Sequence, residues 1–410
     1  MPIADELLRP LVGMRVLDLS RIVSGPMCGR ILADLGADVV KIEPPTLDTT
    51  RMVAQAGDGT SPYFAQMNAG KRNVCVDIKN SDGAQLIADL AEHADALVEN
   101  FRPGVLARHG LGPDDLLRRN PRLVYCSVTG WGQDGPWRNR PAYAPLVHAE
   151  AGTMEMTGRL RGARPEQEVQ VHGDVYPGVM AATAVLAALL QRTTTGYGQH
   201  LDVAMGEVML YVNDWAAVEL QGYDGDRSPF DTWTHPVVEL GDGTQVALLG
   251  NPARMLPTWM RIFAGEGVVA DLRVQDLEEA YADPDPAIEL LREVMRSIPD
   301  AAAFEERVAG LGPVGAVLRS VHELGTSEWA VGRDAVTEVQ PGVSVPRAPW
   351  RSDRAHVGVS GPPAACNQDA VDVLADWLGY GKEAVDALRS AGALHDPIAE
   401  DTAPDSRELR

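Results

Sequence analysis

The fold is decided near the N-terminus by residues 15–42, which read RVLDLSRIVSGPMCGRILADLGADVVKI. Residues 15–20 and 38–42 are short, largely apolar runs that are typical of buried strands. Ser24-Gly25-Pro26 opens a helix between them, and Gly36 ends it. A strand, a helix and a second strand in this order predict a βαβ unit, the beginning of a parallel α/β sheet.

Further strands are predicted at residues 73–78, 96–98 and 123–128, with helices at 81–93 and 113–120. Together with the first unit they indicate a doubly wound, Rossmann-like parallel sheet whose loops gather at the carboxyl ends of the strands, where such sheets bind ligands. The chain has no G-x-G-x-x-G motif and no G-x-x-x-x-G-K-[ST] motif. The sequence therefore gives no motif that would indicate a dinucleotide-binding protein or a P-loop kinase or ATPase.

The pattern changes after about Tyr211. Residues 237–249 form an expected hairpin around Gly241-Asp242-Gly243, and amphipathic helices follow to about Ala309. This composition predicts a smaller α+β domain. Residues 347–363 are rich in proline and glycine and are expected to be an extended connector to helices at 367–378 and 382–390.

Composition and charge narrow the function. The chain has 410 residues, of which 45% are hydrophobic and 23% charged, and its net charge is −22. This acidity argues against nucleic acid and anionic membrane surfaces as partners. Residues 179–190 are too short to cross a membrane, and the N-terminus carries no secretory pattern, so we expect a cytoplasmic protein.

The cysteines indicate a reducing compartment. The chain has four, Cys28, Cys75, Cys126 and Cys366, and none forms a C-x-x-C pair. We expect buried free thiols, with neither a disulfide framework nor a zinc site. No H-E-x-x-H or similar spacing is present, so no metal is expected.

A lone carboxylate stands at the start of a long apolar helix. Residues 173–190 read GDVYPGVMAATAVLAALL, and Pro177 is suited to a first helical turn. Asp174 therefore falls at or just before a helix N-terminus, where free N–H groups and the helix dipole favour a charged carboxylate. The local pattern alone is that of an N-cap aspartate.

The residues after this helix favour a second role. Residues 195–205 read TGYGQHLDVAM, and the combined GD…G…AA…LAAL…R…TG-x-GQ-x-x-D-V-A-M pattern resembles family III CoA-transferases, the CaiB/BaiF family. This superfamily includes formyl-CoA and carnitine CoA-transferases and 2-methylacyl-CoA racemases. Further family marks occur in order along the first half of the chain: LGADVVKIE at 35–43, DALVENFRPG at 95–104 and GWGQDGP at 130–136.

The resemblance implies a site. It makes Asp174 the covalent nucleophile and places Val23 and Ser24 along the thioester arm of CoA. Some family members carry glutamine where Val23 stands, and Pro44-Pro45 stand where the family often has a basic residue. The remaining residues implied to contact CoA, chiefly its nucleotide end, are Lys71, Arg72, Asn100, Phe101 and Arg108, with Trp131 near the acyl group.

The resemblance also implies a reaction and an assembly. The aspartate would attack an acyl-CoA thioester, pass through an anhydride and an aspartyl-CoA thioester, and give CoA to a carboxylic acid acceptor. Acyl-CoA is then a substrate, and no tightly bound cofactor is implied. The expected architecture is an interlocked homodimer whose large domain, 1–210, is completed by residues 330–410, with the small domain at 225–325.

Two alternatives remain open. A 2-methylacyl-CoA racemase would pair the aspartate with a histidine, but Tyr143 occupies the position where racemases carry it. His148, where transferases commonly have glutamine, and His172 are auxiliary candidates, each also readable as a structural histidine. The second alternative, from another functional class, is a non-catalytic CoA-binding protein that kept the fold.

Overall fold

A computed structural model of the chain describes residues 8–55, 59–223, 235–264, 285–312 and 314–395. The chain divides into two compact units. The large unit takes residues up to 155, 166–216 and 330 onward, and the small unit takes 156–165 and 217–329. Both ends of the chain therefore build the large unit.

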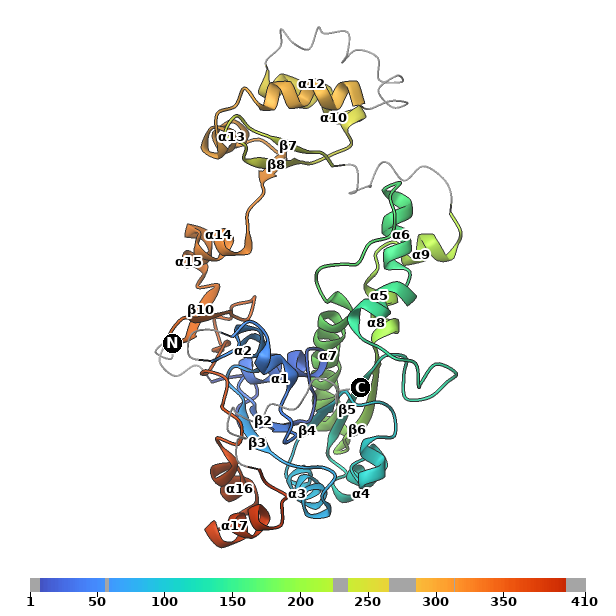
Figure 1. Cartoon of the computed structure of the whole chain (residues 1–410), viewed down its shortest axis with the longest axis vertical. Helices are drawn as coiled ribbons and strands as arrows, with labels where there is room; N and C mark the ends of the chain where they lie inside the picture. Colours follow the sequence, from blue (N-terminus) through green and yellow to red (C-terminus); the bar gives the residue numbers. More distant parts are fainter. Residues whose placement is uncertain (1–7, 56–58, 224–234, 265–284, 313, 396–410) are drawn as a thin grey trace. The chain divides into compact units, whose positions relative to one another are not determined.

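A parallel six-stranded sheet organises the large unit (Figure 1). Its spatial order is β3-β2-β1-β4-β5-β6, so the expected doubly wound parallel sheet is confirmed. The strand order reverses between β1 and β4, and ligands bind at the carboxyl ends of strands at such a switch point. The strands are β1 (Arg15–Asp18), β2 (Asp38–Glu43), β3 (Arg72–Cys75), β4 (Ala96–Glu99), β5 (Val124–Thr129) and β6 (Gln199–Ala204).

Helices cover both faces of this sheet because successive strand residues point to opposite sides. Val16 packs with residues of α1 and α7, while its neighbour Leu17 packs with residues of α3 and α16. The helices of the large unit are α1 (Ser24–Asp34), α2 (Pro62–Asn68), α3 (Ser81–Glu92), α4 (Pro113–Arg119), α5 (Ala144–Glu150), α7 (His172–Thr195), α8 (Met205–Val212), α16 (Ala370–Leu378) and α17 (Lys382–Ser390), with short 3₁₀ turns η2 (Thr49–Met52) and η3 (Leu106–His109).

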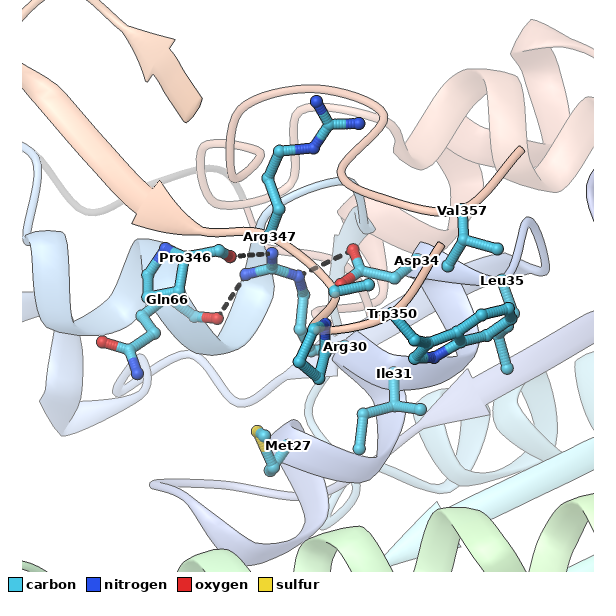
Figure 2. Close-up of a pocket in the computed structure, with 12 residues that line it drawn as sticks. Met27, Arg30, Ile31, Asp34, Leu35, Gln66, Pro346, Arg347, Trp350 and Val357 are labelled. Atoms are coloured by element: carbon cyan, nitrogen blue, oxygen red, sulfur yellow. Dashed lines mark hydrogen bonds and ion pairs between the residues drawn. The ribbon is translucent and has the colours of Figure 1, made fainter. Parts of the chain in front are cut away.

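The C-terminal part of the chain returns to α1. The hairpin of β10 (Val336–Gln340) and β11 (Val343–Pro346) leads into a pocket against α1, which Figure 2 shows. Arg30 on α1 donates to Asp34 at 2.9 Å, to the Gln66 carbonyl at 2.5 Å and to the Pro346 carbonyl at 3.0 Å (Figure 2). This guanidinium joins α1, α2 and the C-terminal hairpin.

The small unit has its own core. An antiparallel sheet of β7 (Val237–Glu239), β8 (Gln245–Leu248) and β9 (Gly315–Val317) includes the expected hairpin. Trp259 and Phe304 are fully buried in its core. Its helices include α10 (Pro252–Phe263), α12 (Asp285–Met295) and α13 (Ala301–Val308). Further short helices in the described part of the chain are α6 (Thr153–Leu160), α9 (Ala216–Leu220), α14 (Val321–Thr326) and α15 (Glu328–Arg333).

Two expectations about α7 were wrong. The helix begins at His172, which places Pro177 inside it and beyond the first turn. It also spans 24 residues and, among the described residues, is the one helix long and apolar enough to cross a membrane by length and composition, so the expectation from residues 179–190 alone understated its apolar length. In the structure 44% of its apolar window is buried, where α7 packs on α1, β5, β6 and α8.

Buried charges gather at the carboxyl ends of β1 and β2. The ammonium of Lys71 lies 2.7 Å from Asp18, and that of Lys41 lies 3.3 Å from Asp48. Burial opposes ionisation of Asp18, but Lys71 and Lys41 hold its pKa below the usual value. Burial lowers the pKa of Lys71 to about 8. These pairs occupy the interior, where an unpaired charge is costly.

We therefore expect Lys71→Met to lower the free energy of unfolding by about 3–5 kcal/mol, because it leaves Asp18 buried without its cation. Lys79→Met is the matched control, since Lys79 is exposed and surface substitutions usually change stability by less than about 0.5 kcal/mol. Urea denaturation measures both variants. Equal stability of the two would contradict a structural role for the Lys71–Asp18 pair.

Candidate functional site

Asp174 lies in the first turn of α7, where the helix N-terminus meets α5. Its side chain is half-buried. The backbone N–H of Ala144, the first residue of α5, donates to its carboxylate. Burial raises the pKa of Asp174 to about 6, and the Ala144 bond opposes this rise. A carboxylate with this pKa is still largely ionised at pH 7 but is more basic than an ordinary aspartate, which suits a nucleophile.

The start of α1 lies against α7 one turn beyond Asp174. A Cβ added at Gly178 would lie 2.7 Å from Cβ of Met27 and would collide with the carbonyl oxygen of Ser24. Glycine is therefore required at position 178 by this close approach. Val23 is the N-cap of α1, and both Val23 and Ser24 are buried. The loop expected along the thioester arm thus stands next to the helix that carries Asp174.

The side chain of Asn100, which follows β4, forms hydrogen bonds to this loop, which follows β1, at the switch point of the sheet. Its Oδ1 accepts the N–H of Arg21 at 2.8 Å, and its Nδ2 donates to the Arg21 carbonyl at 2.8 Å and to Ser24 Oγ at 3.2 Å. The next residue, Ile22, has φ of 71°, and its N–H donates to Asp48 at 3.1 Å. A β-branched residue in this region is strained, and such strain clusters at functional sites.

The buried carboxyl group of Glu99 stabilises the turn that follows β4 and contains Asn100. Glu99 ends β4 and accepts the N–H of Phe101 at 2.7 Å. Burial raises the pKa of Glu99 to about 7, although the Ser127 hydroxyl and the Phe101 N–H favour its ionised form. Ser127 Oγ in turn lies 3.0 Å from Nε2 of His200. Phe101 itself is partly buried against the core.

Lys71 and Arg72, expected at the nucleotide end of CoA, have other partners. The Lys71 ammonium donates to Asp18, to the Pro26 carbonyl at 2.8 Å and to Asn68 at 2.9 Å, which uses its three protons inside the protein. Arg72 pairs with Asp38 and with Asp376. In this arrangement Lys71 presents no donor to a phosphate, because its side chain extends into the interior and not toward solvent.

Exposed arginines near the Asn100 turn offer phosphate donors instead. Arg102 and Arg108 are both exposed. Nη2 of Arg138, from the loop after β5, lies 4.0 Å from the Cβ position of Gly104. None of these three guanidinium groups forms an ion pair with a carboxylate of the described residues. Arg102 and Arg138 were not singled out from the sequence, although an arginine after Phe101 was a visible signal.

Trp131 packs beside α8 in a small cluster of aromatic side chains. Its ring packs against Gly206, where a Cβ would lie 2.6 Å from Cε3 of the indole. It meets Trp137 edge-on at 5.1 Å between ring centroids, and Arg140 stacks on Trp137 at 3.9 Å. The indole N–H of Trp131 is buried and has no hydrogen-bond partner among the described residues.

The auxiliary candidates differ in exposure. Tyr143 is the N-cap residue of α5 and is 58% exposed. His148 is 1% exposed, and its Nε2 accepts the N–H of Gly173 at 2.7 Å. His172 lies between Glu168, at 3.0 Å from its Nδ1, and Gln170, at 2.7 Å from its Nε2, and stacks on Tyr176. Among the described residues, no cluster of three or more His, Cys, Asp or Glu side chains is placed to hold a metal ion.

Residues 11–370 match the family model described as CoA-transferase family III. The chain belongs to this family. Its architecture is similar to that of a CAIB/BAIF family protein from Brucella suis, with a TM-score of 0.81 and 25% identity over 91% of this chain and 100% of that one.

Curated relatives support the same family. A succinate–glutarate CoA-transferase of Agrobacterium fabrum is 35% identical over 67% of this chain and 69% of its own length. An acyl-CoA transferase of Fusarium pseudograminearum is 40% identical over 49% of this chain. That second alignment spans 46% of the Fusarium protein, so the chain spans about half the length of this relative.

The contact between α1 and α7 gives a testable expectation. Gly178→Ala should destabilise the large unit by about 1–3 kcal/mol, because the new methyl group forces the two helices apart. Gly332→Ala is its control, since a Cβ there meets no atom within 4 Å and alanine favours a helix. Thermal and urea unfolding test this. A Gly178→Ala protein as stable as the control would contradict the close approach.

Proposed function

We propose that this protein is a CoA-transferase that moves CoA from an acyl-CoA thioester to a free carboxylic acid, with Asp174 as the covalent nucleophile. The observation that carries the proposal is the half-buried Asp174 at the start of α7, with its pKa raised to about 6 and its carboxylate held by the Ala144 N–H. Family membership supplies the reaction class.

The first half of the reaction forms a covalent enzyme. A carboxylate oxygen of Asp174 attacks the thioester carbonyl carbon, the C–S bond breaks, and CoA leaves as a thiolate. This gives an anhydride between Asp174 and the donor acyl group. The thiolate then attacks the aspartyl carbonyl, which releases the donor acid and leaves an aspartyl-CoA thioester.

The second half reverses these steps with the acceptor. The acceptor carboxylate attacks the aspartyl thioester and displaces the thiolate, which gives a second anhydride. The thiolate attacks the acceptor carbonyl, so that the new acyl-CoA leaves and Asp174 is regenerated. A carboxylate reacts slowly with a thioester in water, and holding the two in contact provides an effective molarity of about 10⁵–10⁸ M.

The residues around Asp174 suggest how acyl-CoA binds. We place the thioester arm along the Val23–Ser24 loop, which Asn100 fastens beside α7. Arg102, Arg108 and Arg138 would contact the phosphates, since guanidinium groups pair with phosphate bidentately. This local basic group would allow an acidic protein to bind a polyanionic substrate.

The geometry disfavours the racemase alternative. A racemase needs a second base at the carbon next to the thioester, and His148 is buried with its Nε2 already occupied by Gly173. His172 is engaged by Glu168 and Gln170. We also propose a cytoplasmic location, which is supported by four buried cysteines that form no disulfide among the described residues.

The covalent step is directly testable. Incubation with succinyl-CoA, acetyl-CoA and other acyl-CoAs, followed by hydroxylamine or borohydride trapping and mass spectrometry, should reveal a modification at Asp174. Asp174→Ala should show none, while Asp242→Asn, a change in the exposed hairpin turn of the small unit, should be modified as the wild type is. Absence of an adduct with every donor, together with deuterium uptake next to the thioester of a 2-methylacyl-CoA, would favour a racemase.

We propose that the protein is a homodimer. Support comes from large apolar side chains that are exposed on two packed helices of the large unit, here called the apolar strip: Tyr176, Val179 and Leu190 on α7 and Leu210 and Tyr211 on α8. Exposed apolar side chains that gather on one part of a surface mark interaction sites.

A charge in this strip should disturb assembly. We expect light scattering after size exclusion to give twice the mass of one chain, and Leu190→Glu to shift the protein toward the monomer. Gln191→Glu adds the same charge at an exposed polar neighbour and should leave the mass unchanged. A wild-type monomer would refute the dimer.

A further inference from the structure

The side chain of His148 is hydrogen-bonded to the backbone of Gly173, the residue directly before Asp174. It lies on the last turn of α5, and its Nε2 accepts the N–H of Gly173 at 2.7 Å. A Cβ at Gly173 would lie 3.1 Å from both Nε2 and Cδ2 of this ring, so the imidazole fits closely against the peptide. The first N–H groups of a helix have no acceptor within the helix, and Val171, the N-cap residue of α7, supplies none from its side chain. His148 supplies one from another helix.

The same helix also contacts the reacting group. Ala144 lies one turn before His148 on α5, and its N–H donates to the Asp174 carboxylate. Two contacts from α5 therefore hold two adjacent residues of α7, one through the Gly173 peptide and one through the Asp174 side chain. Loss of the first would let the Asp174 backbone move relative to the donor at Ala144.

The contact at Gly173 requires one protonation state of the ring. Nε2 must carry a lone pair to accept the Gly173 N–H, so the proton of a neutral His148 is on Nδ1. Nδ1 is buried and has no hydrogen-bond partner among the described residues. An imidazolium has two N–H donors and no acceptor, and it would have to give up the Gly173 bond.

We propose that His148 is a positioning residue for the nucleophile: its neutral imidazole holds the Gly173 peptide and so aims Asp174 at the thioester, and protonation of the ring releases it. This inference rests on the proposed function of Asp174. It assigns His148 a role through Asp174 and no contact with substrate.

Burial is the main factor that favours the neutral form of His148. Burial lowers its pKa below the usual value, and His172, with ring centroids 6.4 Å apart, acts in the same direction. Glu168 opposes them from 3.9 Å. Glu150 on α5 and Glu207 and Tyr211 on α8, the other helix packed on α5, are exposed.

Two substitutions separate acceptance of a hydrogen bond from simple filling of space. The amide oxygen of His148→Gln accepts the Gly173 N–H at every pH, whereas His148→Leu fills the space without an acceptor. We expect His148→Leu to lower kcat by about 10–100-fold with little change in KM for the acyl-CoA, since small misplacements of reacting groups have effects of this size. His148→Gln should stay within about threefold of the wild type.

The pH profile gives a readout that a merely structural histidine would not move. The wild-type kcat/KM should fall on acidification with the uptake of two protons, one on Asp174, whose pKa is about 6, and one on His148, because both must be deprotonated. His148→Gln should retain only the one-proton fall from Asp174. His322→Gln, at an exposed site in the small unit, should keep the two-proton profile.

The outcomes distinguish the two proposals. No transfer by the wild type with any acyl-CoA would refute the proposed function, while ¹⁵N NMR of the histidines would still report whether His148 carries its proton on Nδ1. An active wild type with an unchanged two-proton profile in His148→Gln would overturn the role of His148. That variant decides the question even if His148→Leu fails to fold.

Discussion

The buried ion pair between Asp18 and Lys71 holds together the part of the large unit on which the site depends. Asp18 ends the central strand β1, and the Lys71 ammonium that pairs with it also binds the Pro26 carbonyl in α1 and Asn68 in α2. One cation thus joins a strand and two helices. Its neighbour Lys41 binds the Ser20 carbonyl at 2.9 Å, and Asp48, beside Lys41, accepts the N–H of Ile22. The buried Lys41 and Asp48 side chains therefore stabilise the loop from Ser20 to Ser24, including the strained backbone of Ile22.

This anchored loop determines how closely α1 approaches α7. Because α1 begins where the loop ends, the collision that excludes a side chain at Gly178 fixes the distance between the loop and the turn that carries Asp174. The second fixed contact comes from α5, through Ala144 and His148. The first two turns of α7, which carry Asp174, the proposed nucleophile, are thus restrained by α1 at Gly178 and by α5 at Gly173 and Asp174.

The sequence predicted the sheet well, because the sheet rests on local patterns, and the role of Asp174 as nucleophile stays a prediction. Apolar runs followed by glycine mark the strands, and Asp174 stands in a stretch whose glycine spacing is distinctive. The role of Lys71 could not be predicted in this way, since lysine beside arginine has the same letters whether its side chain faces solvent or an internal aspartate. The partners of Asn100 and His148 lie 79 and 25 residues away along the chain, and no local pattern reports such contacts. Pro177 misled us about the start of α7, because the helix tolerates a proline beyond its first turn.

The return of the C-terminal segment to the sheet has a consequence for biosynthesis. The edge strand β3 is covered by residues 367–369: Asn367 accepts the N–H of Cys75 at 3.0 Å, and Asp369 accepts that of Asn73 at 2.8 Å. Almost 300 residues separate these partners, so β3 leaves the ribosome long before its cover. Contacts so distant along the chain slow folding, and an uncovered strand edge is prone to pair with other chains. A nascent chain would therefore carry an open sheet edge until residues 367–369 have been synthesised, and we expect protection by chaperones to matter most during that interval.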